Sequence, residues 1–427
     1  MSAAKLSHSG LAPLRHRNFA LLWSGQTISI AGNGMFTIAL PLEVLRLTRS
    51  PLDLALVLAA RTIPAIVLLL IGGTVVDRLS RRTVMLVSDA TCGLALAVLT
   101  VLVVTRAERL PVFLVLAAIL GGASAFFRPA STAIVRDLLP QELLMPANSL
   151  SSLSESLAQF LLGPMLGGVL VAVAGAAWAF GIDAATFAVS ATCLAAMRNI
   201  TEIKAAKQGL TRGMAEGIRY CRSQRWLWWS MFALGLANLA CFAPAAILEP
   251  LMVRNVFHSG SVAFAIMVAA IGVGGAIASV ITARLATPRR PVASMWTAWI
   301  AAGVLAAGVG LSPWLWLADV LFGLSWAMVY YGNIVWFSTI QALTPATLLG
   351  RVSSVDWLIS LSLTPLGMIA AGAAVIAIGV RPTVLIGGLI TATAGAILLI
   401  PGVTAPDKAM DIADRPSVLA PMTTAAD

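Results

Sequence analysis

The stretch that decides the fold is GTVVDRLSRR, residues 73–82, which lies between two long apolar runs. It places four charges within six residues, at Asp77, Arg78, Arg81 and Arg82. A soluble core has no use for such a cluster between two hydrophobic helices, whereas membrane proteins carry basic residues in tight cytoplasmic turns. The stretch therefore predicts a cytoplasmic turn between two membrane-spanning helices.

The composition of the whole chain supports this interpretation. Of its 427 residues, 59% are hydrophobic and only 11% are charged, with a net charge of +10. In a soluble protein that excess of Lys and Arg would suggest a nucleic-acid partner. Here the basic residues lie in turns between apolar runs, so membrane topology explains them and we expect no nucleic-acid partner. The three histidines and four cysteines form no cluster, and we expect neither a metal nor another cofactor.

The apolar runs predict an all-α membrane protein. Each is about 20 residues or longer, enough to cross a hydrocarbon core of about 30 Å. The runs are continuously apolar and do not alternate, which excludes a β-barrel and leaves helices. The twelve candidate spans are 19–45, 52–76, 83–105, 111–135, 142–174, 177–197, 227–255, 262–284, 291–311, 314–342, 349–378 and 383–402.

The distribution of basic residues predicts the orientation of these spans. With both termini inside, 20 of the 28 Lys and Arg residues fall on the inner side and six on the outer side, and Arg61 and Arg128 lie within spans. This bias predicts a multi-pass protein of the cell (inner) membrane with cytoplasmic termini. The first apolar run is too long for a signal peptide, so we expect it to remain as a helix.

The domain boundary follows the sixth span. Residues 199–225 are the longest polar stretch between spans, and they form either a helix lying on the inner leaflet or a solvated linker. On each side of them, residues 1–198 and 226–402 form six-helix bundles. The polar tail, 403–427, is expected to be cytoplasmic and disordered.

The two halves look like repeats. A proline-leucine pair ends the first span of each half, at Pro41-Leu42 and at Pro250-Leu251. Two pseudo-symmetric six-helix bundles, with a site between them at mid-membrane, are the plan of a transporter.

The turn at residues 73–82 closely resembles the signature loop between helices 2 and 3 of the major facilitator superfamily, although Ser80 stands where that family usually has glycine. The resemblance implies that Asp77, Arg81 and an acid at the end of span 4, here Asp137, form a charge network that latches the cytoplasmic side. The alternative is a positive-inside anchor only. The residues of this expected latch are Gly73, Asp77, Arg78, Arg81, Arg82 and Asp137.

Span 5 carries a second motif. The proline of Gly163-Pro164-Met165-Leu166-Gly167-Gly168 removes a backbone hydrogen bond and kinks the helix. Gly163 and Gly167 lie four residues apart and allow another helix to approach closely. The string resembles the antiporter signature of drug-efflux members of the superfamily, although Gln159 occupies a position often held by glycine. Ordinary packing of small residues is the alternative.

The same span carries a polar stripe. Asn148, Ser152, Glu155 and Gln159 share one helix face, which should meet water or another helix rather than lipid. Arg128 lies at a depth similar to that of Glu155, and a pair of the two would offset two costly charges. The pair is either a static structural ion pair or a substrate or proton site.

Other polar residues lie within spans. Near the opposite face, Arg61 and Asp183 are placed so that they can pair. Asn33 stands in span 1 where relatives that export macrolides or siderophores often have aspartate. Coupling to protons then needs another acid, for which Glu155 and Asp89 are the candidates. Asp89 could equally be a partner for the basic turn.

The opening stretch Leu14–Gln26 looks like the branch that contains siderophore exporters and macrolide efflux pumps. This resemblance implies a monomeric exporter of a small amphipathic molecule, driven by proton exchange in the lipid bilayer. No phosphate-cradling loop is present, so ATP is not the direct energy source. The alternatives are a lysophospholipid flippase or an uptake permease of the same fold, or an intramembrane enzyme or channel. The substrate cannot be deduced from the sequence.

Overall fold

The computed structural model describes residues 12–76, 80–140, 157–198, 210–284, 290–345 and 348–399, together with positions 143, 147, 150, 151, 153–155 and 288. Within these residues, twelve helical segments are long and apolar enough to cross a membrane. The prediction of an all-α membrane protein with twelve spans is therefore confirmed.

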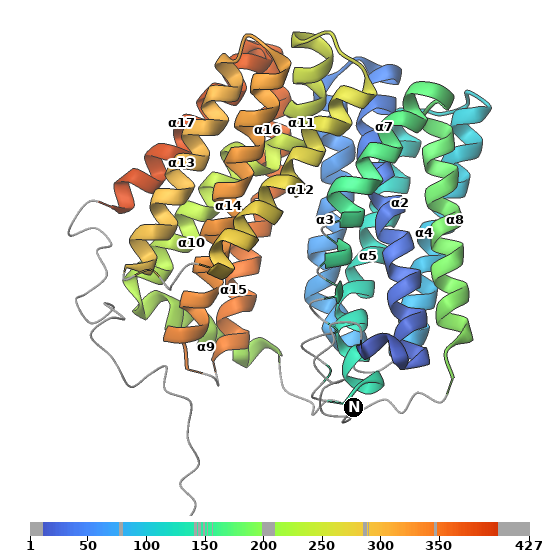
Figure 1. Cartoon of the computed structure of the whole chain (residues 1–427), viewed down its shortest axis with the longest axis horizontal. Coiled ribbons are helices and arrows are strands. Elements are labelled where there is room, and N and C mark those ends of the chain that lie inside the picture. Colours follow the sequence, from blue (N-terminus) through green and yellow to red (C-terminus); the bar gives the residue numbers. More distant parts are fainter. Residues whose placement is uncertain are drawn as a thin grey trace, which may run out of the picture.

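The first half of the chain forms one bundle, on the right in Figure 1. A short 3₁₀ helix η1, Ala12–Arg15, precedes it. Its helices are α2 Arg17–Thr48, α3 Pro51–Val76, α4 Arg81–Val104, α5 Leu110–Leu138, the π-helical η2 Ala158–Leu162 running into α7 Gly163–Ala174, and α8 Ala176–Ala196.

The second half forms the other bundle, with α9 Leu210–Ser223 between the two. Its first span is interrupted and consists of α10 Arg225–Ala237, the π-helical η3 Asn238–Phe242, α11 Ala243–Leu251 and the π-helical η4 Met252–Val256. The remaining helices are α12 Ser261–Arg284, α13 Pro291–Leu311, α14 Leu315–Leu343, α15 Leu349–Ser362, α16 Thr364–Ile378 and α17 Val380–Leu398.

Two equivalent turns show the internal repeat. Gly175 joins α7 to α8 with φ +88° and ψ 168°, and Gly379 joins α16 to α17 with φ +85° and ψ 171°. This backbone region is accessible essentially only to glycine. The fifth and sixth spans of each half are therefore connected by the same turn.

The bundles contact each other at one end, which we call the seam end. There α7 packs against α12 and α3 packs against α16, whereas the ribbons diverge toward the other end, which carries α9 and η1 (Figure 1). We call that second end the α9 end. The joint between the halves therefore lies at the seam end.

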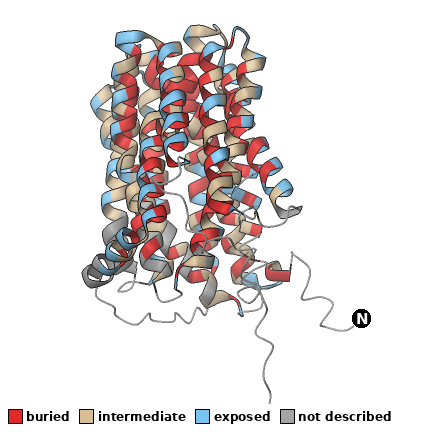
Figure 2. Cartoon of the chain, turned by 90° about the vertical axis from the view of Figure 1, so that its left-hand side faces the viewer, coloured by how far each residue is buried: buried red, intermediate tan, exposed pale blue. Residues whose placement is uncertain are grey.

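Apolar side chains also cover the outside of the molecule. Figure 2 shows buried residues along the helix faces that meet and exposed ones on the outer faces. The exposed set includes Val173, 83% exposed, and Leu94, 68% exposed. Such a surface suits a hydrocarbon environment, where apolar exposure carries no penalty.

Helix α9 occupies part of the polar stretch 199–225. Its Cys221 is fully buried, and the Tyr220 hydroxyl donates to the Leu343 carbonyl at 3.3 Å. On the opposite side the exposed Arg222 stacks over Trp228, 5.8 Å from the ring centroid. One face of α9 therefore packs on the second bundle, and its contact with a lipid leaflet stays a prediction.

Candidate functional site

The glycines of span 5 lie where helices touch. A Cβ added at Gly167 would lie 2.7 Å from the Met35 Cα, and one added at Gly163 would lie 2.7 Å from the Gly34 Cα. Real Cβ atoms essentially never come that close. Gly163 and Gly167 therefore let α7 lie directly on α2, with Pro164 also buried in this contact.

The next glycine of the motif faces the other bundle. A Cβ at Gly168 would lie 2.5 Å from the Ala265 Cβ of α12, and the Ser261 hydroxyl donates to the Gly168 carbonyl at 2.8 Å. We call this contact the first seam. The second seam joins α3 to α16, where a Cβ at Gly372 would lie 2.9 Å from the Ala55 Cβ. The string at 163–168 therefore lies at the joint between the bundles.

The expected latch is described in part. Arg81 and Asp137 form an ion pair between α4 and α5, with their side chains 12% and 0% exposed. Arg82 donates from Nε to the Leu194 carbonyl at 2.7 Å, which satisfies the end of α8. The backbone of Gly73 lies in α3. Asp77 and Arg78 lie outside the described residues.

Three intramembrane residues come together inside the first bundle. Arg61, Asp89 and Asp183 extend from α3, α4 and α8, and all three interact electrostatically with Cys92. Arg61 lies over the Phe36 ring at 4.9 Å and does not form a direct ion pair with Asp183. We call this group the first-bundle polar cluster. It unites residues that the sequence placed in separate spans.

Each acid of this cluster has polar neighbours. The Thr186 hydroxyl lies 3.2 Å from a carboxylate oxygen of Asp183, and Ser190 lies against Asp89. Asp89 is 2% exposed and Asp183 is 1% exposed. These hydroxyls and the Arg61 charge offset part of the cost of two buried carboxylates.

Two amides lie beside α2. Asn33 is half-buried and donates to the Ser29 carbonyl of its own helix at 3.1 Å. The Gln159 amide reaches the Thr37 hydroxyl at 3.5 Å. Asn33 therefore makes a contact within α2, and Gln159 joins η2 to α2.

Glu155 lies on an exposed part of span 5. The expected pair of Glu155 with Arg128 stays a prediction. The Arg128 side chain, Asn148 and Ser152 lie outside what the structure describes. Across the joint, Glu155 interacts electrostatically with Tyr330 of α14. Glu155 therefore faces the second bundle.

An aromatic wall stands on that opposite side. The rings of Phe242 and Trp326 lie 5.9 Å apart, and those of Trp326 and Tyr330 lie 6.3 Å apart. Phe322 adds an edge contact to Trp326 at 6.3 Å. Aromatic faces bind apolar groups and attract cations. The wall and the Glu155 carboxylate together form a surface suited to an amphipathic molecule.

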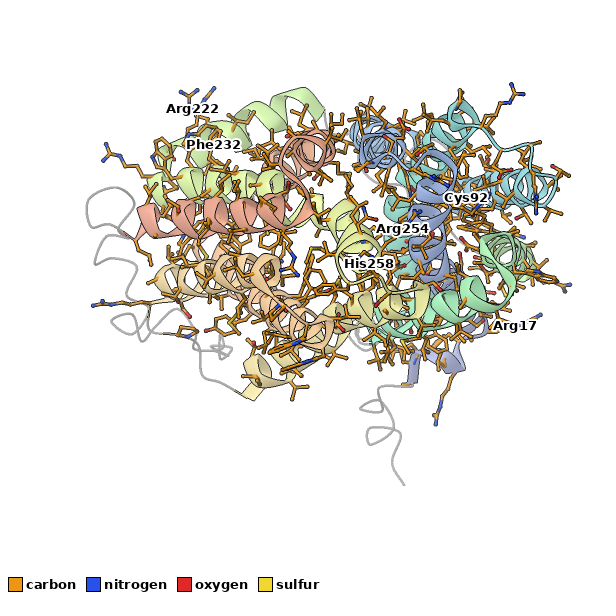
Figure 3. The ribbon with its side chains drawn as sticks, turned by 90° about the horizontal axis from the view of Figure 1, so that it is seen from above. Arg17, Cys92, Arg222, Phe232, Arg254 and His258 are labelled. Atoms are coloured by element: carbon orange, nitrogen blue, oxygen red, sulfur yellow. The ribbon has the colours of Figure 1, made fainter. Side chains whose placement is uncertain are left out.

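A charge network at the seam end was not predicted. Arg46 bonds Glu43 through Nε at 3.0 Å and Glu108 through Nη2 at 2.5 Å, and both carboxylates are buried. The network borders a cavity of about 530 Å³ between the bundles, which Arg106 and Arg254 also line. We call this cavity the seam vestibule, and Figure 3 shows Arg254 near the line where the bundles meet.

A sequence signal for this network did exist. Glu43 lies inside the first apolar run, and an acid at membrane depth marks a functional or paired site by default. Glu249, inside the seventh span, carries the same signal and was also missed. Arg46 lies three residues after Glu43, within reach on the same helix. What the sequence lacked was the second carboxylate, because Glu108 follows Arg46 by 62 residues.

Twelve helices in two bundles, joined at a glycine-lined contact, define a secondary transporter of the major facilitator type. The family model for transmembrane secretion effectors matches residues 8–423, and the chain belongs to this family of the major facilitator superfamily. The family resemblance of the sequence is therefore confirmed, and the chain is a membrane transporter rather than an enzyme.

Two relatives are similar over most of their length. The multidrug efflux pump Tap of Mycolicibacterium fortuitum is 27% identical over 396 residues, covering 89% of this chain and 93% of Tap. The enterobactin exporter EntS of Citrobacter koseri is 27% identical over 348 residues, covering 79% of this chain and 80% of EntS.

The fold is similar to that of solved transporters. A bacterial homologue of the human lysosomal transporter Spinster, in an inward-facing and occupied conformation, matches with a TM-score of 0.69 at 13% identity. The match covers 90% of this chain and 96% of the homologue. At this identity the likeness concerns the fold alone.

Proposed function

We propose that this chain exports a small amphipathic molecule from the cytoplasm by alternating access, in exchange for protons. In this proposal the α9 end and both termini face the cytoplasm, and the protein works as a monomer in the cell membrane. The names of Tap and EntS, an efflux pump and an exporter, support the direction of transport. The excess of basic residues on the side of the α9 end supports the orientation.

The observation that carries the proposal is the first seam. Gly168, inside the antiporter-like string, contacts Ala265 and accepts a hydrogen bond from Ser261 of the other bundle. The contact is small and closely packed, and it lies at one end of the joint. It is therefore suited to be made and broken as two rigid bundles rock about a central site.

The chemistry of the facing surfaces supports the substrate class. Glu155 presents a carboxylate toward the wall of Phe242, Trp326 and Tyr330. Rings and a carboxylate together favour a lipophilic cation or a neutral amphipath over a polyanion. Within the proposed class we therefore expect positively charged aromatic compounds to bind better than anionic siderophores.

A transport assay tests the proposal. Ethidium serves as the cationic probe, an iron-free catecholate as the anionic one and a fluorescent lysophospholipid as the lipid, in inverted vesicles from a host without its own pumps. We expect uptake of ethidium that requires an imposed pH gradient and stops when a protonophore collapses it. Transport of the lysophospholipid alone would make the chain a flippase, and uptake unaffected by the protonophore would exclude proton exchange.

A further inference from the structure

One acid of the second bundle takes no part in the contacts above. Glu249 lies in α11, directly before Pro250, and is 8% exposed. It lines a cavity of about 40 Å³ between α11 and helices α13, α14 and α17. The walls include Leu248, Met252 and Phe322, and the Cys241 thiol is the other polar side chain among the lining residues.

The carboxylate has no partner within the part of the chain that the structure describes. Neither an ion pair nor a side-chain hydrogen bond joins Glu249 to another described residue. In this respect it differs from Asp89, which has the Ser190 hydroxyl as a neighbour, and from Asp183, which has the Thr186 hydroxyl and the Arg61 charge. An ionised carboxylate in such surroundings is costly, whereas a protonated one is not.

The cavity is large enough to hold water. A site needs about 10–15 Å³ of this kind of space for one water molecule, so the cavity beside Glu249 can hold one or more. None of the charged side chains on the described parts of the elements that pack around α11 lines this cavity. Those charged side chains are Arg17, Glu43, Arg46, Asp53, Arg61, Arg254, Asp319 and Arg381.

The segment that carries Glu249 separates two cavities. Leu248, Glu249 and Met252 line the inner cavity, while Pro250, Val253 and Arg254 line the seam vestibule of about 530 Å³. Glu249 and the residues that line the vestibule therefore lie on different faces of the same segment.

The backbone of this wall is irregular. Pro250 provides no backbone N–H, and the helix is π-helical on both sides of α11, at η3 and η4. Interruptions of this type are frequent at functional sites in helices. α11 also contacts α2 and α3 of the other bundle, so this segment is itself part of the contact between the bundles.

We propose that Glu249 is a proton-binding site of this transporter. The protons reach it from the seam vestibule. The carboxylate takes up one proton to become a neutral carboxylic acid, and it returns that proton when the bundles have rocked. The inference rests on the proposed proton exchange and names the group that performs it. It assigns coupling to the second bundle, at a cavity that shares Phe322 with the aromatic wall.

A labelling experiment tests proton binding without any substrate. N,N′-Dicyclohexylcarbodiimide is apolar and adds to protonated carboxylic acids. The intact protein in phospholipid vesicles is treated at pH 6 and pH 9, and peptides are analysed by mass spectrometry. We expect Glu249 to be labelled at pH 6 and much less at pH 9. Equal labelling at both pH values, or none at pH 6, overturns the inference.

A transport experiment tests coupling. One proton moving down a gradient of one pH unit supplies about 1.4 kcal/mol, which supports about tenfold accumulation of the monovalent cation ethidium in a one-for-one exchange. In Glu249→Gln we expect gradient-driven ethidium uptake to fall toward onefold, while counterflow of ethidium persists. Asp319→Asn removes another acid of the same bundle as a matched control, and we expect it to respond to the gradient.

The outcomes separate the two proposals. If the unmodified protein responds to the gradient and Glu249→Gln responds equally, the inference about Glu249 fails and proton exchange stands. If the unmodified protein does not respond at all, proton exchange fails, and the labelling result alone decides whether Glu249 binds protons. If Glu249→Gln is not inserted, the labelling of the unmodified protein still decides.

Discussion

Filling the glycine at the first seam is the sharpest test of the alternating-access proposal. In Gly168→Val, the Cβ alone would lie 2.5 Å from the Ala265 Cβ and 2.9 Å from the Ser261 carbonyl oxygen. Neither neighbour is the end of a flexible side chain, so the two helices must separate. We therefore expect the substitution to open the seam end and leave the interior of each bundle intact.

The size of the effect follows from the cost of overpacking. Adding atoms to a well-packed contact costs about 1–3 kcal/mol, and here the cost applies only to the conformation in which the seam is closed. A difference of 1.4 kcal/mol is a factor of ten in an equilibrium constant. We therefore expect Gly168→Val to shift the equilibrium toward the seam-open state by about 5- to 150-fold.

The assay is the reactivity of a cysteine at the second seam. Ala55→Cys places a thiol at a position that is 0% exposed when the seam is closed. A membrane-impermeant maleimide added to whole cells reports how often this position is open to the outside. We expect faster labelling when Gly168→Val is present and a loss of ethidium export.

Matched substitutions make the result interpretable. Gly168→Ala adds only the Cβ and should have a smaller effect of the same sign. Gly260→Val lies at the same end of the molecule, where an added Cβ meets nothing within 4 Å, and should have none. Unchanged labelling and normal export from a correctly inserted Gly168→Val protein would refute the role of the seam.

Three further predictions concern charged and thiol groups. Asp137→Asn removes one carboxylate partner of the half-buried Arg81 and should cost about 1.5–3 kcal/mol of stability, the value of a hydrogen bond to a charged group. The effect is seen as a lower melting temperature of the purified protein, and an unchanged melting temperature contradicts the pairing. Glu155→Gln should weaken ethidium binding by about fivefold, because one exposed charge pair contributes about 1 kcal/mol. Binding of a neutral dye should be unaffected. Equal losses for both dyes contradict a role for the charge. Burial, with a smaller contribution from the Asp356 carboxylate, raises the pKa of the Cys221 thiol to about 11. Because the reactive thiolate is lost below that pKa, Cys221 should resist maleimide at pH 7 until the protein is denatured, and rapid labelling of the native protein at pH 7 contradicts this.

The spans and the family could be predicted because both depend on local sequence. A run of about 20 apolar residues forms a membrane-spanning helix in a bilayer, whatever segments lie next to it. The charged turn at residues 73–82 likewise identifies its family by spacing alone. The contact between Gly168 and Ser261 needed the structure, because nothing in span 5 says which helix lies against it.

The polar residues show the limit of reading one helix at a time. The spacing of Glu155 and Gln159 places them on one face of span 5, but it does not say what that face meets. The structure puts Glu155 toward the aromatic wall of the other bundle. For Arg61 and Asp183 the sequence suggested a pair, whereas the structure brings them into one cluster with Asp89 without a direct ion pair between them. Contacts of this kind depend on tertiary packing.

The energies of the seam and of one proton are of similar size. Opening the first seam breaks the hydrogen bond from Ser261 to Gly168, worth about 0.5–1.5 kcal/mol net, and separates Ala265 from its contact. The transfer of one proton through 100 mV provides about 2.3 kcal/mol. Larger side chains at this contact would hold the bundles together with more energy than the transfer of one proton supplies. Gly168 therefore matters for more than close approach, because it keeps the closed first seam weak enough for a single protonation to change the balance between the two conformations.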